Sequence, residues 1–321
     1  MVLTLYTFLT GVIYMIFALF LVCREYFLPS LFTIVDKWSC TQDVAGGVIM
    51  AAGFSFPDLV VSIIGIMVSV QEVSIGSLVG SICFNLLVLL GITGLFVKNL
   101  NIGGWCIVRD ILFHLVALII LCLFFIDHQL MWYESLILTL TYGAFCLFMK
   151  FNHKLKTLMR GKASNDDNDL AMNDNMGAEP SFNSTQGICQ EILDDEPLGL
   201  NLPKKGNAEK VFHIFMFPII ALLWLTMNWF DVRKNGKWFI ISYILSIVWM
   251  CIFDYLLVWW TSTAGAAFGV PPLIIGMVFL GLVFAFPALY LTTKTAKHGL
   301  GDMVFSFISG MNIFKMTIRY T

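Results

Sequence analysis

The stretch AAGFSFPDL at residues 51–59 returns as GLVFAFPAL at residues 281–289, a constant 230 positions further along the chain. At this offset eight positions carry the same residue without a gap, and in the first copy they are Gly46, Val48, Phe54, Phe56, Pro57, Leu59, Gly80 and Phe84. Such self-similarity predicts two related halves in one fold. Each copy also has a proline inside an apolar run, where it removes a helical hydrogen bond. Both copies are therefore predicted to contain a broken helix.

The composition places these two halves in a membrane. Of the 321 residues, 59% are apolar and 12% are charged, whereas soluble domains carry about 25% charged residues. The formal net charge of −2 leaves no basic field to bind nucleic acid. The eight cysteines are scattered, mostly inside apolar runs, without zinc-ligand spacing. The sequence therefore predicts an all-α polytopic membrane protein.

Apolar runs long enough to cross a bilayer, which needs roughly 20 residues, mark the expected spans. The runs are 3–23, 44–70, 73–97, 105–126, 131–151, 211–230, 238–261, 272–294 and 300–318. The run 211–230 is different because it contains Pro218 and Asn228 and ends beside Asp231, as an interfacial segment does. If it lies flat, nearly all Lys and Arg fall on the cytoplasmic side, as the positive-inside rule requires. We therefore expect eight spans with the amino terminus outside.

The segment 152–210 separates the two membrane halves, 1–151 and 211–321. It has basic residues at both ends and is acidic between them, among Asn, Ser and Gly. Because it has little apolar area to bury, it is expected to be a disordered linker, and its basic ends place it in the cytoplasm. A cytoplasmic regulator could bind this acidic loop, although a solvated linker is the simpler interpretation.

The eight-span count orients the two copies oppositely, so repeat 1 (43–96) and repeat 2 (273–315) are predicted to be inverted repeats. Transporters built in this way place their ion site near the midplane of the bilayer, on broken helices. Asp58 follows the proline of repeat 1, and a carboxylate at that depth needs a cavity or a partner. Ser55 shares its helical face, and Ser81 and Asn85 lie four apart on the next helix. The alternatives are a protonated Asp58 bonded to a neighbouring helix and Ser or Asn side chains that only join helices.

These residues carry a resemblance to a known family. The segments that resemble its first and second alpha repeats are DVAGGVIMAAGFSFPDLVVSIIG (43–65) with VGSICFNLLVLLGITGLF (79–96), and IIGMVFLGLVFAFPALY (274–290) with KHGLGDMVFSFISGMNIF (297–314). Further matches are RD (109–110), WYE (132–134), MKFN (149–152), DVR (231–233) and YLLVWW (255–260). The sequence is similar to the potassium-dependent sodium/calcium exchangers of the cation/calcium exchanger superfamily. The resemblance implies a ten-helix fold, of which the last two helices are expected to be missing beyond Thr321.

The resemblance also implies a site. Members of the family move Ca²⁺ and K⁺ against Na⁺ by alternating access, with acids and hydroxyl or amide oxygens from both repeats. By this match Asp58 stands for the acid of the first repeat. Asp58 and Asn85 are the expected Ca²⁺ or Na⁺ ligands. Further expected ligands are Ser55, Ser81 and Asn312. The second repeat departs from the family pattern at Ala285, Ala288, Met311 and Lys315. Asp254 falls where the family has a neutral residue, and its role stays open between a replacement carboxylate and a structural pair.

Two functions follow from these residues. The first is a membrane cation antiporter in the plasma membrane, with the lipid bilayer and cations as its partners and no cofactor besides the transported ions. The second is a transport-impaired paralogue with a regulatory or binding role, because Ca²⁺ usually needs more than one carboxylate and Ala288 and Lys315 replace two acids. A charged Lys315 would act as a tethered cation in place of a transported one. An enzyme is not expected, since neither a nucleophile elbow nor a metalloprotease motif is present.

Overall fold

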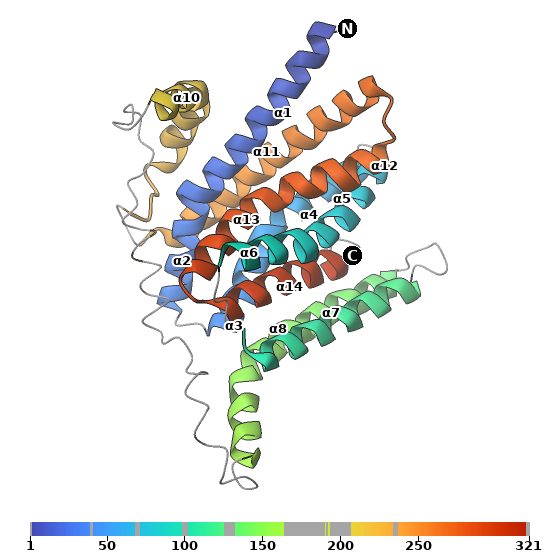
Figure 1. Ribbon diagram of the computed structural model, residues 1–321, viewed down its shortest axis with the longest axis vertical. Helices are drawn as coiled ribbons and strands as arrows, with labels where there is room; N and C mark the ends of the chain where they lie inside the picture. Colours follow the sequence, from blue (N-terminus) through green and yellow to red (C-terminus); the bar gives the residue numbers. More distant parts are fainter. Residues whose placement is uncertain are drawn as a thin grey trace. The chain divides into compact units, whose positions relative to one another are not determined.

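The computed structural model describes residues 2–38, 41–67, 71–97, 102–124, 132–163, 190, 192, 207–233 and 237–318. Every regular element in these ranges is helical (Figure 1). The elements are α1 (Val2–Val22), η1 (Cys23–Phe27), α2 (Leu28–Lys37), α3 (Gln42–Val44), η2 (Ala45–Met50), α4 (Ala51–Met67), α5 (Gln71–Phe84), η3 (Asn85–Leu89), α6 (Leu90–Phe96), α7 (Gly104–Phe124), α8 (Trp132–Ala163), α10 (Asn207–Met227), α11 (Phe239–Phe268), α12 (Pro272–Ile274), η5 (Ile275–Leu280), α13 (Gly281–Lys297) and α14 (Gly301–Ile318). The label η marks π-helical turns, which are wider than α-helical ones.

Seven helical stretches among the described residues are long and apolar enough to cross a membrane. They are Phe8–Lys37, Gln42–Val60, Gly76–Phe96, Gly104–Phe124, Trp132–Phe151, Phe239–Phe268 and Pro272–Lys297. The predicted all-α polytopic membrane protein is thereby confirmed. The first stretch continues through η1 and α2 to Lys37, beyond the predicted end at residue 23.

One further helix, α14, explains the difference from the eight predicted spans. Helix α14 is 18 residues long, but it does not belong to the seven apolar stretches. Its residues from Met303 to Thr317 are all buried, so protein surrounds it and it needs no apolar surface for lipid. Helix α10 has a shorter apolar stretch, His213–Met227. This agrees with the sequence analysis, which did not count the run 211–230 among the eight spans. Whether α10 lies flat stays a prediction.

The element boundaries recur at the offset of 230 found in the sequence. Helix α3 begins and ends 230 positions before α12, and the same holds for η2 with η5 and for α4 with α13. The prolines Pro57 and Pro287 remain inside α4 and α13. The sequence predicted that the helices break at these prolines, and this position is wrong, because α4 and α13 continue through them. In the proline-containing stretch of each repeat, the irregular turn is η2 or η5, which precedes the proline and contains Gly46 or Gly276, where helices pack closely.

The described chain divides into two compact units, and each contains segments from both repeats. Unit 1 comprises 1–38, 56–84 and 188–291, and unit 2 comprises 39–55, 85–187 and 292–321. Each unit contains residues from both predicted halves, 1–151 and 211–321, and the division into these halves stays a prediction. Most of the predicted linker 152–210 lies outside the described residues, so its disorder and its regulator stay predictions. Within 152–210 the structure describes the end of α8, residues 190 and 192, and the start of α10.

In unit 1, α1 and α11 lie side by side, and Gly11 of α1 faces the ring of Trp260 on α11 (Figure 1). Helix α5 packs against α12 and η5. This contact is close because the Cα of Gly76 faces the carbonyl of Leu273 and that of Gly80 faces the carbonyl of Met277. From the first contact to the second, the residue number rises by four on both sides, from Gly76 to Gly80 and from Leu273 to Met277. The two segments therefore run parallel.

Unit 2 contains the matching contact between η2 and α14. Gly46 faces the carbonyl of Met303, and Gly310 faces the carbonyl of Gly47. Helices α7 and α8 also pack against α14. At the offset of 230, the first contact corresponds to Gly276 against Val73, and the second to Gly80 against Met277. Each unit therefore pairs the first helix of one repeat with the second helix of the other.

Candidate functional site

In unit 2 the structure joins two of the predicted ligands, one from each repeat. Asn85 opens η3, and Asn312 lies in α14, which contacts η3. The Nδ2 of Asn85 donates a hydrogen bond of 3.0 Å to the Oδ1 of Asn312, and both side chains are buried. The Nδ2 of Asn312 has no hydrogen-bond partner within the described part of the chain. The bond uses the amide nitrogen of Asn85 and not its amide oxygen, and such oxygens bind hard cations.

Ser55 also belongs to unit 2, at the point of α4 just before Pro57. Its side chain is 1% exposed, and its Oγ finds no hydrogen-bond partner among the described residues. A buried hydroxyl without a partner costs free energy, so it needs an explanation. A cation ligand is one explanation, because a bound ion would satisfy the oxygen.

Unit 1 holds the predicted carboxylate and one further hydroxyl. Asp58 of α4 is 6% exposed, and its main-chain carbonyl accepts a 2.6 Å hydrogen bond from the Oγ of Ser62. Ser81 of α5 is buried and donates its proton to the carbonyl of Leu78 at 3.0 Å. The lone pairs of its oxygen remain available to a cation. Predicted ligands are thus divided between the two units, each with its own buried environment.

A second buried acid lies in unit 1. Asp254 is 2% exposed and belongs to α11. Both Asp58 and Asp254 lie close enough to Cys251 of α11 to act on its thiol electrostatically. The sequence marks Asp254 as an acid inside an apolar run, but its neighbours depend on tertiary packing, which has no signal in a single sequence.

The four departures from the family pattern are also buried. Ala285 and Ala288 belong to unit 1 and are 3% and 1% exposed, while Met311 and Lys315 belong to unit 2 and are 1% and 4% exposed. Lys315 therefore does not extend its ammonium to the protein surface. These positions lie inside the protein, where a change of charge alters the electrostatic potential most strongly.

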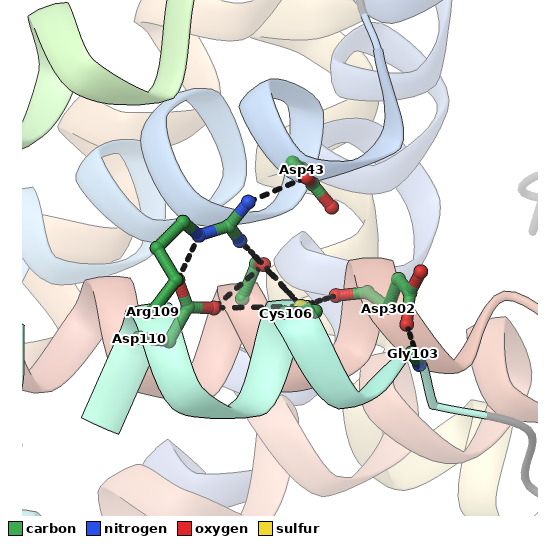
Figure 2. Close-up of polar contacts among 7 residues, drawn as sticks. Asp43, Gly103, Cys106, Arg109, Asp110 and Asp302 are labelled. Atoms are coloured by element: carbon green, nitrogen blue, oxygen red, sulfur yellow. Dashed lines mark hydrogen bonds and ion pairs between the residues drawn. The ribbon is translucent and has the colours of Figure 1, made fainter. Parts of the chain in front are cut away.

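A polar cluster that the sequence did not predict as a unit lies elsewhere in unit 2 (Figure 2). Arg109 and Asp110 of α7 form an ion pair of 2.7 Å, and Arg109 forms a second one of 2.6 Å with Asp43. Ser306 of α14 accepts a 2.9 Å hydrogen bond from Arg109 and donates one of 2.8 Å to Asp110. The available signal was two adjacent opposite charges inside an apolar run, which need partners in a membrane.

Among the described residues, no group of three or more His, Cys, Asp and Glu side chains is arranged as a metal site. The predicted ligand set differs from such a group because it consists mainly of hydroxyl and amide oxygens. Oxygen ligands of this kind suit Na⁺, K⁺ and Ca²⁺, which exchange rapidly, and contrast with the Cys and His ligands of structural zinc sites.

Comparison with known proteins identifies the family. The family model described as "Sodium/calcium exchanger protein" matches residues 8–151 and 238–319 of this chain. The chain belongs to this family, and the resemblance described from its motifs is confirmed at this level.

Particular relatives are the sodium/potassium/calcium exchangers. Exchanger 2 of Mus musculus is 28% identical over 96% of this chain and 66% of its own length. Exchanger 5 of Homo sapiens is 29% identical over 95% of this chain and 67% of its own length. The chain thus spans about two thirds of the length of these relatives. A solved structure of the sodium-calcium exchanger NCX_Mj has a TM-score of 0.56 at 15% identity, over 97% of this chain and 80% of that chain, and supports the same fold.

Proposed function

We propose that this chain is a membrane cation antiporter that moves Ca²⁺, together with K⁺, against Na⁺ by alternating access. Its expected location is the plasma membrane. The proposal rests on family membership and on the buried oxygens of the predicted site. The observation that carries it furthest is the hydrogen bond between Asn85 and Asn312, because it places one predicted ligand from each repeat in direct contact.

The ligand chemistry supports a hard cation. Asp58 supplies a carboxylate, Ser55 and Ser81 supply hydroxyl oxygens, and Asn85 and Asn312 supply amide oxygens. Ca²⁺ takes 6–8 oxygen ligands and usually more than one carboxylate. In this chain the second acid would be Asp254, which lies in the same unit as Asp58 and acts on the same thiol. A lower affinity for Ca²⁺ than in a site with more acids is the expected consequence.

The test is Na⁺-gradient-driven uptake of ⁴⁵Ca²⁺ in cells expressing the chain, with and without K⁺. The antiporter proposal predicts uptake that depends on the Na⁺ gradient and is abolished by Asp58→Asn. The matched control is Asp36→Asn, which removes a less buried carboxylate of α2 and leaves uptake unchanged. Uptake that survives Asp58→Asn would contradict the assignment of this residue.

The alternative is the transport-impaired paralogue, which the sequence suggests because Ala288 and Lys315 stand at positions where the family resemblance implies acids. A correctly inserted chain without any uptake would favour it. In that case the double variant Ala288→Asp with Lys315→Asp should gain uptake, because it restores two carboxylates and removes one ammonium. A double variant that is correctly inserted and still inactive would contradict the charge explanation.

A further inference from the structure

The guanidinium of Arg109 binds side chains from three helices (Figure 2). Its Nε donates to Oδ1 of Asp110 at 2.7 Å, its Nη1 to Oδ2 of Asp43 at 2.6 Å and its Nη2 to Oγ of Ser306 at 2.9 Å. These partners belong to α7, α3 and α14. Because the guanidinium is planar and its donors have fixed directions, such a set of bonds fixes the relative orientation of its partners.

The cluster is closed and deeply buried. The side chains of Arg109 and Asp110 are 1% and 0% exposed, whereas that of Asp43 is 20% exposed. The hydroxyl of Ser306 accepts a hydrogen bond from Arg109 and donates one to Oδ2 of Asp110, so it is both an acceptor and a donor within the cluster. The two carboxylates exceed the guanidinium by one negative charge, and the partly exposed Asp43 can carry that charge at least cost.

The position of the cluster connects it to the amide pair. Asp43 lies just before η2, and Ser306 lies in α14 one turn beyond Met303, whose carbonyl faces Gly46 of η2. Asn312 follows Ser306 by six residues in the same helix, which corresponds to about 9 Å along its axis. Arg109 therefore binds residues at both partners of the contact between η2 and α14: Asp43, just before η2, and Ser306 of α14. The same α14 carries Asn312.

We propose that Arg109 is a positioning residue for the cation site. Its guanidinium holds α3 and α14 in one register, and this register brings the side chain of Asn312 to that of Asn85. The inference deepens the proposed antiport, and only its consequence for transport rests on that function. The geometric part, which concerns the separation of residues 85 and 312, stands independently of transport.

The first experiment measures that separation. In the purified full chain carrying N85C and N312C, a short bifunctional thiol reagent links the two positions, and mass spectrometry identifies the joined peptides. The yield is compared in the Arg109, R109K and S306A backgrounds, each checked for cooperative thermal unfolding. We expect at least a threefold fall in both variants, since lysine keeps the charge without the fork and S306A keeps all charges. Equal yields in folded variants would overturn the proposal.

The matched control is R24K. Arg24 pairs with Glu25 at 3.5 Å, but its side chain is 44% exposed. A solvent-exposed pair of this kind orients little, so the yield is expected to stay unchanged. A fall in R24K equal to that in R109K would also overturn the proposal, because any lost arginine would then have the same effect.

The second experiment measures ⁴⁵Ca²⁺ uptake per folded molecule in chains that keep Asn85 and Asn312. R109K is expected to raise KM for Ca²⁺ at least threefold with a smaller change in kcat. An unchanged KM together with fewer folded molecules would assign Arg109 to stability alone and overturn the positioning role. If the wild-type chain shows no uptake but the crosslink falls in R109K, antiport fails while the positioning of residues 85 and 312 by Arg109 stands.

Discussion

The two closely packed helix pairs, α5 with η5 in unit 1 and α14 with η2 in unit 2, share one frame but differ in chemistry. In both, glycines bring one backbone against the carbonyls of the other. Only the pair in unit 2 carries the Arg109 cluster and the amide bond. At the offset of 230, Asp43 corresponds to Leu273 and Ser306 corresponds to Gly76.

The difference teaches that close packing and polar chemistry are separable. Small residues set the spacing of both pairs, so this part of the fold can repeat with few identities. The Arg109 cluster is then specific to one pair, because Leu273 and Gly76 stand in the other pair where the cluster has Asp43 and Ser306. The account therefore predicts symmetric effects for glycine substitutions and one-sided effects for polar substitutions.

The largest one-sided effect is expected for Arg109→Met. This change leaves the buried Asp110 without its guanidinium, and breaking a buried pair costs roughly 3–5 kcal/mol in the free energy of unfolding. Adding Asp110→Asn should recover part of this loss, because it removes the uncompensated charge. The measurement is thermal unfolding of the purified chain. If Arg109→Met left the free energy of unfolding unchanged, the claim that the Arg109 cluster stabilises the helix pair of unit 2 would be contradicted.

A symmetric effect is expected for Gly80→Val and Gly310→Val. A side chain at either position meets a backbone carbonyl, that of Met277 or that of Gly47, so each helix pair must move apart. Overpacking of this kind costs roughly 1–3 kcal/mol. The same unfolding measurement compares the two variants.

The control for the glycine variants is Gly91→Ala. Gly91 lies in α6 with open space around it, and alanine should be neutral or stabilise by about 0.5–1 kcal/mol. If Gly80→Val were tolerated while Gly310→Val was not, the common frame of the two pairs would be refuted.

A smaller one-sided effect is expected for Thr292→Val. Thr292 and Thr93 form a buried hydrogen bond of 3.1 Å between helices, whereas Ser62, its counterpart in repeat 1, bonds to the carbonyl of Asp58 in its own helix. Thr292→Val leaves Thr93 without this partner and should cost about 1–2 kcal/mol. Ser62→Ala should cost less. Chemical denaturation of both variants tests the order, and the reverse order would contradict the account.

Much of the repeated frame was predictable from the sequence, because its signals are local. The offset of 230, the helix positions and the buried Asp58 all follow from residue patterns. The π-helical turns η2 and η5 were not predictable, since proline was the stronger local signal although glycines set the close contact. The partners of Arg109 were also hidden, because Asp43 and Ser306 lie 66 and 197 residues away in the sequence.

The candidate site was predictable residue by residue but not in its contacts. Asn85 and Asn312 were both expected ligands, yet their direct hydrogen bond depends on how α14 packs against η3. Asp254 was visible as an acid in an apolar run, but only the folded chain shows that it shares a unit with Asp58. Single-sequence patterns specify which residues are buried, whereas tertiary packing decides which of them meet.

The most direct test of the central claim is equilibrium binding of ⁴⁵Ca²⁺ to the purified full chain, with Na⁺ as a competitor. The account predicts saturable binding that Na⁺ displaces, that Asp58→Asn abolishes and that Asn85→Ala weakens. Ca²⁺ binding that persists in Asp58→Asn, or that Na⁺ does not displace, would contradict the proposal that Asp58 binds a cation for which Ca²⁺ and Na⁺ compete.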